Sequence, residues 1–496
     1  MIEEWERPGS PERAAVAAMT PAERADFLRA QRFPKLDVLT AGLPEGVASV
    51  LARALGGDAE LIVLRGAAME SLALGGRLAQ IFEHHPHGIG ELRMRDSRLG
   101  DEEAQKMLTV LGSWDSERPF KLKALDLSSC DLFRDQSTAV LLQQAIKASL
   151  SLRELTLSLN PLGDPGAHLL ASVLKPSGAL FCPLVSLDLR RCGIGPAGGA
   201  ALCDALSSNE SLRSLNLTGN LFCNDVMGAP AVGRLLAGAS AAAGLGLTSL
   251  VCGDCALKTT SSVEVVLGGL RNGTNRSLQH LIVPSNSFGE TTANLFAAAL
   301  EAQPQLLTLQ LSGCSLSDAT ARLLGAVLAN HKGLQTLHLG QNDIRDAGAG
   351  ALGRAIESNN ALWELALNDN AIGPSGMNAI FTALRFNKSL AVLNLAGNTF
   401  GKGSRAAISL SLCLRYNGDV SEEFKRKKMM QNFLIQAHHP SHASSLYCSH
   451  SNTYTASFLP VKGHEYAFLF SSRILAYCSF AFPCWACVCI FLVIGL

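Results

Sequence analysis

A leucine pattern that returns every 28 residues constrains this sequence more than any other feature. Between residues 278 and 400 the spacing Leu-x-x-Leu-x-Leu-x-x-Asn/Cys-x-Leu recurs with few substitutions, and its first leucine stands at Leu278, Leu306, Leu334, Leu362 and Leu390. A fixed period of this length is typical of a solenoid, in which each repeat contacts only its neighbours. We therefore expect a stacked array rather than a single globular core.

Less regular copies of the pattern precede this stretch. They begin at Ile89, Leu122, Leu152, Leu184, Leu212 and Leu247, and a degenerate first copy contains Leu61 and Val63. The steps from Ile89 to Leu278 vary between 28 and 35 residues, and we expect the extra residues in loops around 176–183 and 237–246. Counting every copy gives about twelve units between residues 58 and 415.

Each unit is predicted to form a strand, a turn and a helix. The leucines of the strand point inward, and the Asn or Cys that follows can hydrogen-bond to the backbone of the turn. Helices are expected over residues 347–357 and 374–386. Parallel strands stack about 4.8 Å apart, whereas packed helices need about 8–10 Å. This mismatch predicts a horseshoe with the parallel β-sheet on its concave face and the helices on its convex face.

The turn residue alternates between cysteine and asparagine, at Cys130, Asn160, Cys192, Asn220 and onward to Asn342. With the 28-residue period and a full helix in each unit, this alternation resembles the ribonuclease-inhibitor-like class of leucine-rich repeats. That class includes ribonuclease inhibitor, the repeat regions of NOD-like receptors and the Ran GTPase-activating protein. The resemblance covers residues 58–415 and implies a right-handed α/β solenoid. It implies little about function, because the matching residues are scaffold positions.

The segments outside the repeats differ in composition. Residues 1–57 are interpreted as a helical N-terminal cap, because Thr20, Pro21 and Glu23 form a capping box that predicts a helix over 21–32. A second helix is expected over 45–55. Residues 416–473 carry a basic run and serine- and histidine-rich stretches without a repeat period, and they are interpreted as a disordered linker.

Residues 474–496 form an uncharged, largely apolar stretch at the end of the sequence. A helix of this length would be about 34 Å long and could cross a bilayer as a tail anchor. The alternative is an unstructured or artefactual tail. The charged N-terminus lacks the apolar region of a secretory signal, which favours a cytoplasmic location, with the alternative of a tail anchor whose repeats face the cytosol.

Charge and motifs exclude several classes of function. Lysine plus arginine equals aspartate plus glutamate at 42 each, which argues against a nucleic-acid partner. Cys252 and Cys255 form a C-x-x-C, but both occupy scaffold positions of a repeat, and the histidines at 84–87 are interpreted as a loop between repeats. We therefore predict no catalytic, cofactor-binding or metal-binding residues, no cofactor, and a protein that is not an enzyme.

The strand residues that flank the inward leucines are expected to face the concave side, because side chains alternate along a strand. These candidate partner-binding residues are Arg93, Arg95, Asp126, Glu154, Asp188, Arg190, His280, Gln310, His338, Trp363, Glu364 and Asn368. A long polar wall of mixed charge suits recognition of a protein surface. We predict a monomeric interaction scaffold that binds an unidentified protein. The alternative is a GTPase activator resembling the Ran GTPase-activating protein. A ribonuclease inhibitor is less favoured, because it would need a more acidic and aromatic groove.

Overall fold

The computed structural model of the protein divides into two compact units, unit 1 (residues 1–288) and unit 2 (residues 289–496), and each is described by itself. The structure describes residues 90–113, 122–176, 184–223, 227–238, 246–272, 275–288 and 292–399, single residues between 75 and 82, residue 182, and the backbone of four strands at 35–39, 61–65, 459–460 and 466–467.

Unit 1 alternates short strands with helices. Its strands are β1 (Lys35–Leu39), β2 (Leu61–Arg65), β3 (Glu91–Arg95), β4 (Ala124–Asp126), β5 (Glu154–Thr156), β6 (Ser186–Asp188), β7 (Ser214–Asn216), β8 (Ser249–Val251) and β9 (His280–Ile282). Its longer described helices are α6 (Gly100–Gly112), α7 (Gln136–Ala148), α8 (Gly163–Leu174), α9 (Pro196–Leu206), α10 (Gly228–Ala237) and α11 (Thr260–Asn272).

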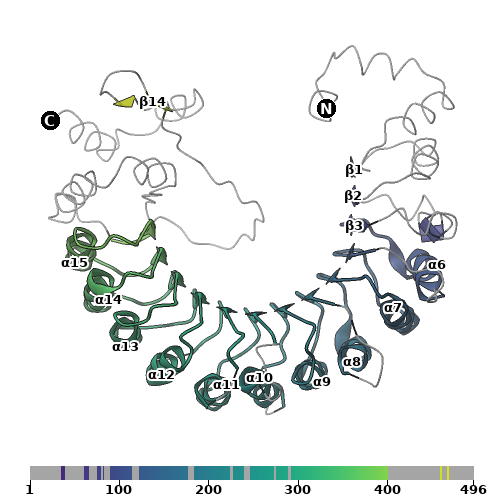
Figure 1. The fold of residues 1–496 in the computed structure, drawn as a ribbon, viewed down its shortest axis with the longest axis horizontal. Coiled ribbons are helices and arrows are strands. Elements are labelled where there is room, and N and C mark those ends of the chain that lie inside the picture. The colour runs from purple at the N-terminus through teal and green to yellow at the C-terminus, as the bar shows by residue number, and fades with distance from the viewer. Residues whose placement is uncertain are drawn as a thin grey trace. The chain divides into compact units, whose positions relative to one another are not determined.

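The strands of unit 1 pair in parallel and in sequence order from β1 to β9. The register places corresponding leucines side by side, so Leu125 faces Leu155 and Leu155 faces Leu187. These leucines are buried between the strands and the helices. Figure 1 shows the strands on the inner side of the curve of this unit and the helices on its outer side. The predicted parallel sheet with alternating helices is confirmed.

The sheet begins earlier than the repeats do. β1 lies in the segment for which a helical cap is predicted, and its Lys35 pairs in parallel with Leu61 of β2. The alternation of Leu36 and Val38 with Asp37 is typical of a strand and explains the difference. The two helices predicted at 21–32 and 45–55 lie outside the described residues.

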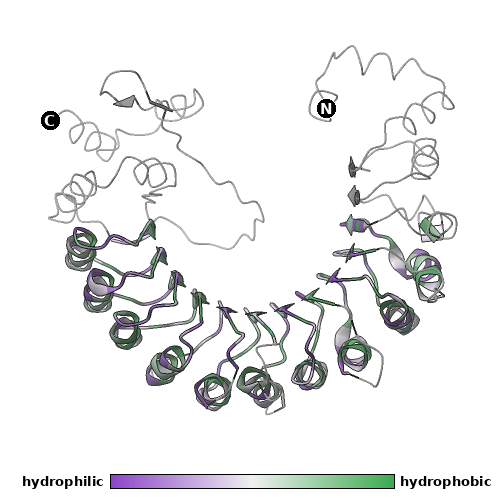
Figure 2. Ribbon diagram, in the orientation of Figure 1, coloured by the Kyte–Doolittle hydropathy of each residue, from purple (hydrophilic) through white to green (hydrophobic). Residues whose placement is uncertain are grey.

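Unit 2 has the same construction. Its strands are β10 (Thr308–Gln310), β11 (Thr336–His338), β12 (Glu364–Ala366) and β13 (Val392–Asn394), and its helices are α12 (Ala293–Ala302), α13 (Asp318–Leu328), α14 (Asp346–Ser358) and α15 (Pro374–Leu384). The strands pair in parallel with a constant offset of 28 residues, as in Leu309 with Leu337. α14 and α15 agree with the predicted helices within two residues. In Figure 2 each helix carries hydrophobic and hydrophilic residues, as expected of a helix with one buried face.

Residues in each repeat are numbered here from the first leucine of the pattern, so that the turn Asn or Cys is the ninth residue. The eighth residue has a positive φ, between 49° and 75°, in each repeat from the one at Ile89 to the one at Leu390. Glycine occupies this position at Gly219, Gly313 and Gly397, but elsewhere the turn forces an ordinary side chain into the left-handed region.

The ninth residue joins each turn to the preceding repeat. Asn220 is fully buried, and its Oδ1 accepts hydrogen bonds from the backbone N–H groups of Cys192 at 3.0 Å and Ile194 at 3.1 Å. Its Nδ2 donates to the carbonyls of Leu189 and Leu217 at 2.7 and 2.8 Å. Asn160, Asn286 and Asn342 make the same four bonds in their own repeats.

Cysteine at the ninth position makes a lesser connection. The Cys192 thiol donates to the carbonyl of Leu157 at 3.3 Å, and the Cys255 thiol donates to that of Leu217 at 3.3 Å. The predicted role of the turn residue, bonding to the backbone of the turn, is thus confirmed for both residue types.

The last part of the sequence is described only in two short strands. β14 (Leu459–Pro460) and β15 (Tyr466–Ala467) pair antiparallel within the segment interpreted as a linker. In the part of the chain that the structure describes, no helix has the length and hydropathy to cross a membrane. The apolar segment at 474–496 lies outside that part, so a tail anchor stays a prediction.

Candidate functional site

The candidate site in unit 1 is the side of the strands that faces away from the helices. It is formed by the third, fifth and seventh residues of each repeat, which alternate with the buried leucines. We call it the unit 1 face, and it extends from β3 to β9. All the predicted candidates up to His280 belong to it.

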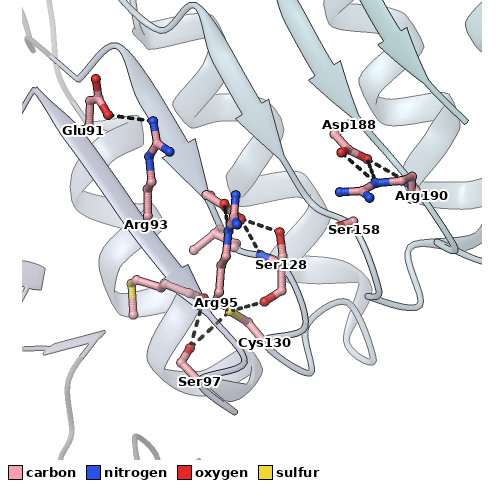
Figure 3. Close-up of polar contacts among 12 residues, drawn as sticks. Glu91, Arg93, Arg95, Ser97, Ser128, Cys130, Ser158, Asp188 and Arg190 are labelled. Atoms are coloured by element: carbon pink, nitrogen blue, oxygen red, sulfur yellow. Dashed lines mark hydrogen bonds and ion pairs between the residues drawn. The ribbon is translucent and has the colours of Figure 1, made fainter. Parts of the chain in front are cut away.

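Arg93 and Glu91 form an ion pair at the β3 end of the unit 1 face. The Arg93 Nη2 donates to Glu91 Oε2 at 2.9 Å, and both side chains are half-buried (Figure 3). The two residues are the third and fifth of the same repeat, and the alternation of side chains along β3 therefore places them on one face. Glu91 is absent from the predicted set, although the rule that selected Arg93 also selects it.

Arg95 pairs with a carboxylate of the next repeat. Its Nε donates to Asp126 Oδ2 at 2.5 Å, and Asp126 Oδ1 accepts hydrogen bonds from the Ser128 backbone N–H at 3.1 Å and from the Ser128 hydroxyl. The Asp126 side chain is only 7% exposed, while that of Arg95 is 53% exposed. The charge that this pair presents to solvent is therefore mainly the guanidinium.

Asp188 and Arg190 repeat this arrangement within one repeat. The Arg190 Nε donates to Asp188 Oδ2 at 2.9 Å and to Oδ1 at 3.1 Å (Figure 3). The Arg190 side chain is 51% exposed and that of Asp188 is 19% exposed. Asp188 Oδ1 also accepts from the Arg190 backbone N–H at 3.1 Å. A fifth-position Asp or Asn binds the seventh N–H in other repeats too, as at Asn216 and Thr218.

Glu154 and His280 are the other predicted residues of the unit 1 face. Glu154 on β5 is exposed, and within the described residues its carboxylate makes no hydrogen bond or ion pair. His280 begins β9 and is half-buried.

In unit 2 the predicted residues occupy the corresponding strand positions. His338 at the end of β11 and Glu364 at the start of β12 are brought together, with 3.0 Å between His338 Nε2 and Glu364 Oε1. Trp363 precedes this glutamate and is 43% exposed. Asn368 donates to Asp369 Oδ2 at 2.8 Å, and Gln310 is half-buried at the end of β10. Asp369 is a second residue that the sequence reasoning missed.

The C-x-x-C cysteines lie in the core rather than on either face. Cys252 and Cys255 are buried, as are Cys203 and Cys223. A shared hydrogen bond with Cys255 and burial both raise the pKa of the Cys252 thiol. Burial raises the pKa of Cys203 to about 12. Thiols that stay protonated are poor nucleophiles and metal ligands, which agrees with the scaffold role predicted for this motif.

Three comparisons place these features beside known proteins. A family model described as "Leucine Rich repeat" matches residues 148–171, 182–203 and 333–353. Ribonuclease inhibitor of Mus musculus is 31% identical over 230 residues, which are 46% of this chain and 46% of the inhibitor. Tonsoku-like protein of Mus musculus is 33% identical over 232 residues, which are 45% of this chain and 16% of that protein.

The similarity is partial in length. The aligned part spans about half of the inhibitor and a smaller share of Tonsoku-like protein. Among solved structures, the complex of Rad7 and Elc1 in yeast gives a TM-score of 0.48 at 17% identity, over 79% of this chain and 88% of that chain.

Proposed function

Because the chain is a leucine-rich-repeat protein of the ribonuclease-inhibitor-like class, we propose that it is a scaffold that binds a protein partner on the unit 1 face. Extended concave surfaces of repeat proteins are used for binding. The relative from Mus musculus is named as an inhibitor of ribonuclease. The identity of this chain's partner has to be inferred from the residues of its own unit 1 face.

The observation that carries the proposal is the exposure of the charged groups on the unit 1 face. Arg95 and Arg190 project from a rigid sheet with about half of each side chain exposed, and each is held by a more buried aspartate. Charged side chains on a rigid surface give an interface its specificity and its rate of association. A mixed-charge wall of this kind favours recognition of another protein.

A pair of matched substitutions tests where the partner binds. Glu154→Arg reverses an exposed charge on β5 of the unit 1 face, and Glu264→Arg reverses an exposed charge on α11 of the helix side. A partner is first identified by cross-linking to the tagged full chain in cells. Its affinity for each purified variant is then measured by calorimetry.

We expect Glu154→Arg to change the affinity by about tenfold or more, in the direction set by the charge of the partner, and Glu264→Arg to change it less than about twofold, since reversing a charge at an interface changes the binding free energy by at least ~1.4 kcal/mol. Equal effects of the two reversals, or a larger effect on α11, would remove the unit 1 face as the binding surface. Acceleration of Ran GTP hydrolysis by the wild-type chain would instead support the alternative of a GTPase activator.

A further inference from the structure

The seventh residues of four successive repeats form a row across the unit 1 face, and this row has an arginine at each end. Its members are Arg95, Ser128, Ser158 and Arg190. Backbone hydrogen bonds fix their alignment, from Asp96 N–H to the Ser128 carbonyl at 3.0 Å, from Ser129 N–H to Ser158 at 2.8 Å and from Leu159 N–H to Arg190 at 2.8 Å. Figure 3 shows the two serines between the two arginines.

The two arginines are separated by three strand-to-strand steps. Because neighbouring strands lie about 4.8 Å apart, the Cα atoms of Arg95 and Arg190 are roughly 14 Å apart. The space between them has a floor of small side chains, since Ser128 and Ser158 are buried and neither projects as far as a guanidinium. A chain that crosses the strands can therefore approach the sheet between the two arginines.

Each guanidinium is held in the same way. Arg95 and Arg190 both use Nε to bind an aspartate, Asp126 and Asp188 respectively. A guanidinium has five N–H donors, and pairing through Nε leaves the four donors of the terminal nitrogens for another acceptor. Arg93 differs, because its pair with Glu91 uses a terminal nitrogen.

We propose that this row binds an extended acidic segment of a protein partner, in which two carboxylates four residues apart pair with Arg95 and Arg190. An extended chain rises about 3.4 Å per residue, so four residues span roughly the 14 Å between the arginines. Arginine binds carboxylates through two parallel N–H groups, for which the terminal nitrogens are suited. This inference rests on the proposed function and specifies the chemistry of its partner.

The distribution of charge favours a sparsely acidic segment over a polyanion. Glu91, Asp126, Glu154 and Asp188 lie on the same face as the arginines. A nucleic acid strand carries a phosphate about every 3.4 Å per strand of duplex. Most of its phosphates would lie near these carboxylates and not near an arginine, which is unfavourable. Two isolated carboxylates instead meet only the two guanidinium groups.

The aspartates also reduce the entropic cost of binding. Ordering a free, rotamer-rich side chain at an interface opposes association, and a side chain that is already held loses less. Asp126 and Asp188 hold the two guanidinium groups before any partner arrives. The row is therefore preorganised for a ligand whose carboxylates have the matching spacing.

Synthetic peptides test the proposal on the purified full chain by fluorescence anisotropy at low ionic strength. The probe is a fluorescein-labelled Gly-Ser peptide with two glutamates four residues apart. Three further peptides place the glutamates two residues apart, replace both by glutamine, or replace both by phosphoserine. We expect the first peptide to bind at least about fivefold more tightly than the peptide with glutamates two residues apart. The peptide with both glutamates replaced by glutamine should show no detectable binding.

Variants identify the groups responsible. Arg95→Gln and Arg190→Gln should each weaken binding of the four-residue peptide by about fivefold or more and abolish its preference for that spacing. The matched control is Arg234→Gln on α10, whose arginine pairs with Asp204 at similar exposure on the helix side and should leave the affinity unchanged. Circular dichroism verifies that each variant is folded.

Three results would overturn the inference. These are equal affinity for both spacings, an unchanged affinity in Arg95→Gln and Arg190→Gln, or binding of the phosphoserine peptide at least tenfold tighter than the glutamate peptide. If the peptides fail while Glu154→Arg still changes the affinity of the cellular partner, the proposed function stands and only this chemistry is wrong. If Glu154→Arg has no effect as well, both are wrong.

Discussion

Replacing Asn220 by alanine should destabilise the protein far more than replacing Asn216, although both asparagines belong to the same repeat. Asn220 is fully buried and joins four backbone groups of two repeats. Asn216 is half-buried on the unit 1 face and accepts one hydrogen bond, from the Thr218 N–H at 3.1 Å. The comparison keeps the substitution constant and changes only the environment.

The expected difference in the free energy of unfolding follows from the backbone groups that lose their hydrogen-bond partner. A net hydrogen bond contributes about 1 kcal/mol, and a buried backbone group left without a partner costs about 1–3 kcal/mol. Asn220→Ala leaves two N–H groups and the Leu189 carbonyl without their partner, while the Leu217 carbonyl keeps its hydrogen bond from the Cys255 thiol. The removed amide leaves room for about one water molecule, which can bond to some of them. We therefore expect a loss of about 3–5 kcal/mol for Asn220→Ala and about 0.5–1 kcal/mol for Asn216→Ala.

Urea unfolding followed by circular dichroism measures the loss, and hydrogen exchange by mass spectrometry locates it. The amides of Cys192 and Ile194 should exchange faster in Asn220→Ala, because they lose their acceptor, and should keep their protection in Asn216→Ala. Similar losses of stability in the two variants, or unchanged exchange at Cys192 in Asn220→Ala, would refute the role assigned to the turn asparagine.

Two further substitutions test separate features of the repeats. The His331 Nδ1 accepts from the Leu334 N–H at 3.0 Å, so the ring is neutral, and burial lowers its pKa below 6.5. As the pH falls, the unfolded chain therefore binds a proton before the folded chain does, and the free energy of unfolding should decrease from about pH 6.5 down to the lowered pKa. His331→Asn should reduce this decrease, as measured by urea titrations at several pH values. An unchanged pH dependence would contradict the assignment. Leu159 is 52% exposed and has a φ of 62°, a conformation that glycine adopts more readily than leucine. Leu159→Gly should therefore raise the free energy of unfolding by about 0.5–1 kcal/mol. A decrease would show that packing of the leucine side chain stabilises the fold.

The repeat architecture could be predicted from sequence because one requirement recurs in every unit. Each repeat must bury the leucines of its strand, so the leucine spacing fixes both strand and helix. The bonding of Asn160 and its equivalents could also be predicted, since a buried polar side chain in a turn needs backbone partners. β1 was missed because its residues lie outside a recognisable copy of the pattern.

The backbone of the turn could not be predicted from residue type. Asp96, Ser129 and Arg191 adopt positive φ values that their own preferences disfavour. The hydrogen bonds to the next repeat impose this conformation, as in the bond from Ser129 N–H to the Ser158 carbonyl. Tertiary context therefore overrides the local preference, and glycine marks only some of these turns.

The positions of the candidate residues on one face were predictable from the sequence, but their contacts were not. Alternation along the strand placed Arg95 and Asp188 on the unit 1 face. The pair between Arg95 and Asp126 depends on the register of two strands whose residues are 31 positions apart in the sequence. Which nitrogen of each arginine meets its carboxylate depends on side-chain conformation, for which the sequence pattern contains no signal.

Asparagine and cysteine at the ninth position make different numbers of hydrogen bonds to the preceding repeat. This difference affects how repeats can be gained or lost during evolution. Asn160 makes three of its four bonds to the preceding repeat of Cys130, and Asn220 makes three to the repeat of Cys192, while the Cys192 thiol makes one bond back to the repeat of Asn160. A duplication of one repeat would place two cysteines or two asparagines in succession. A duplication of a Cys–Asn pair preserves every bond, so the pair is the natural module of inheritance and of engineered truncation in this part of the chain.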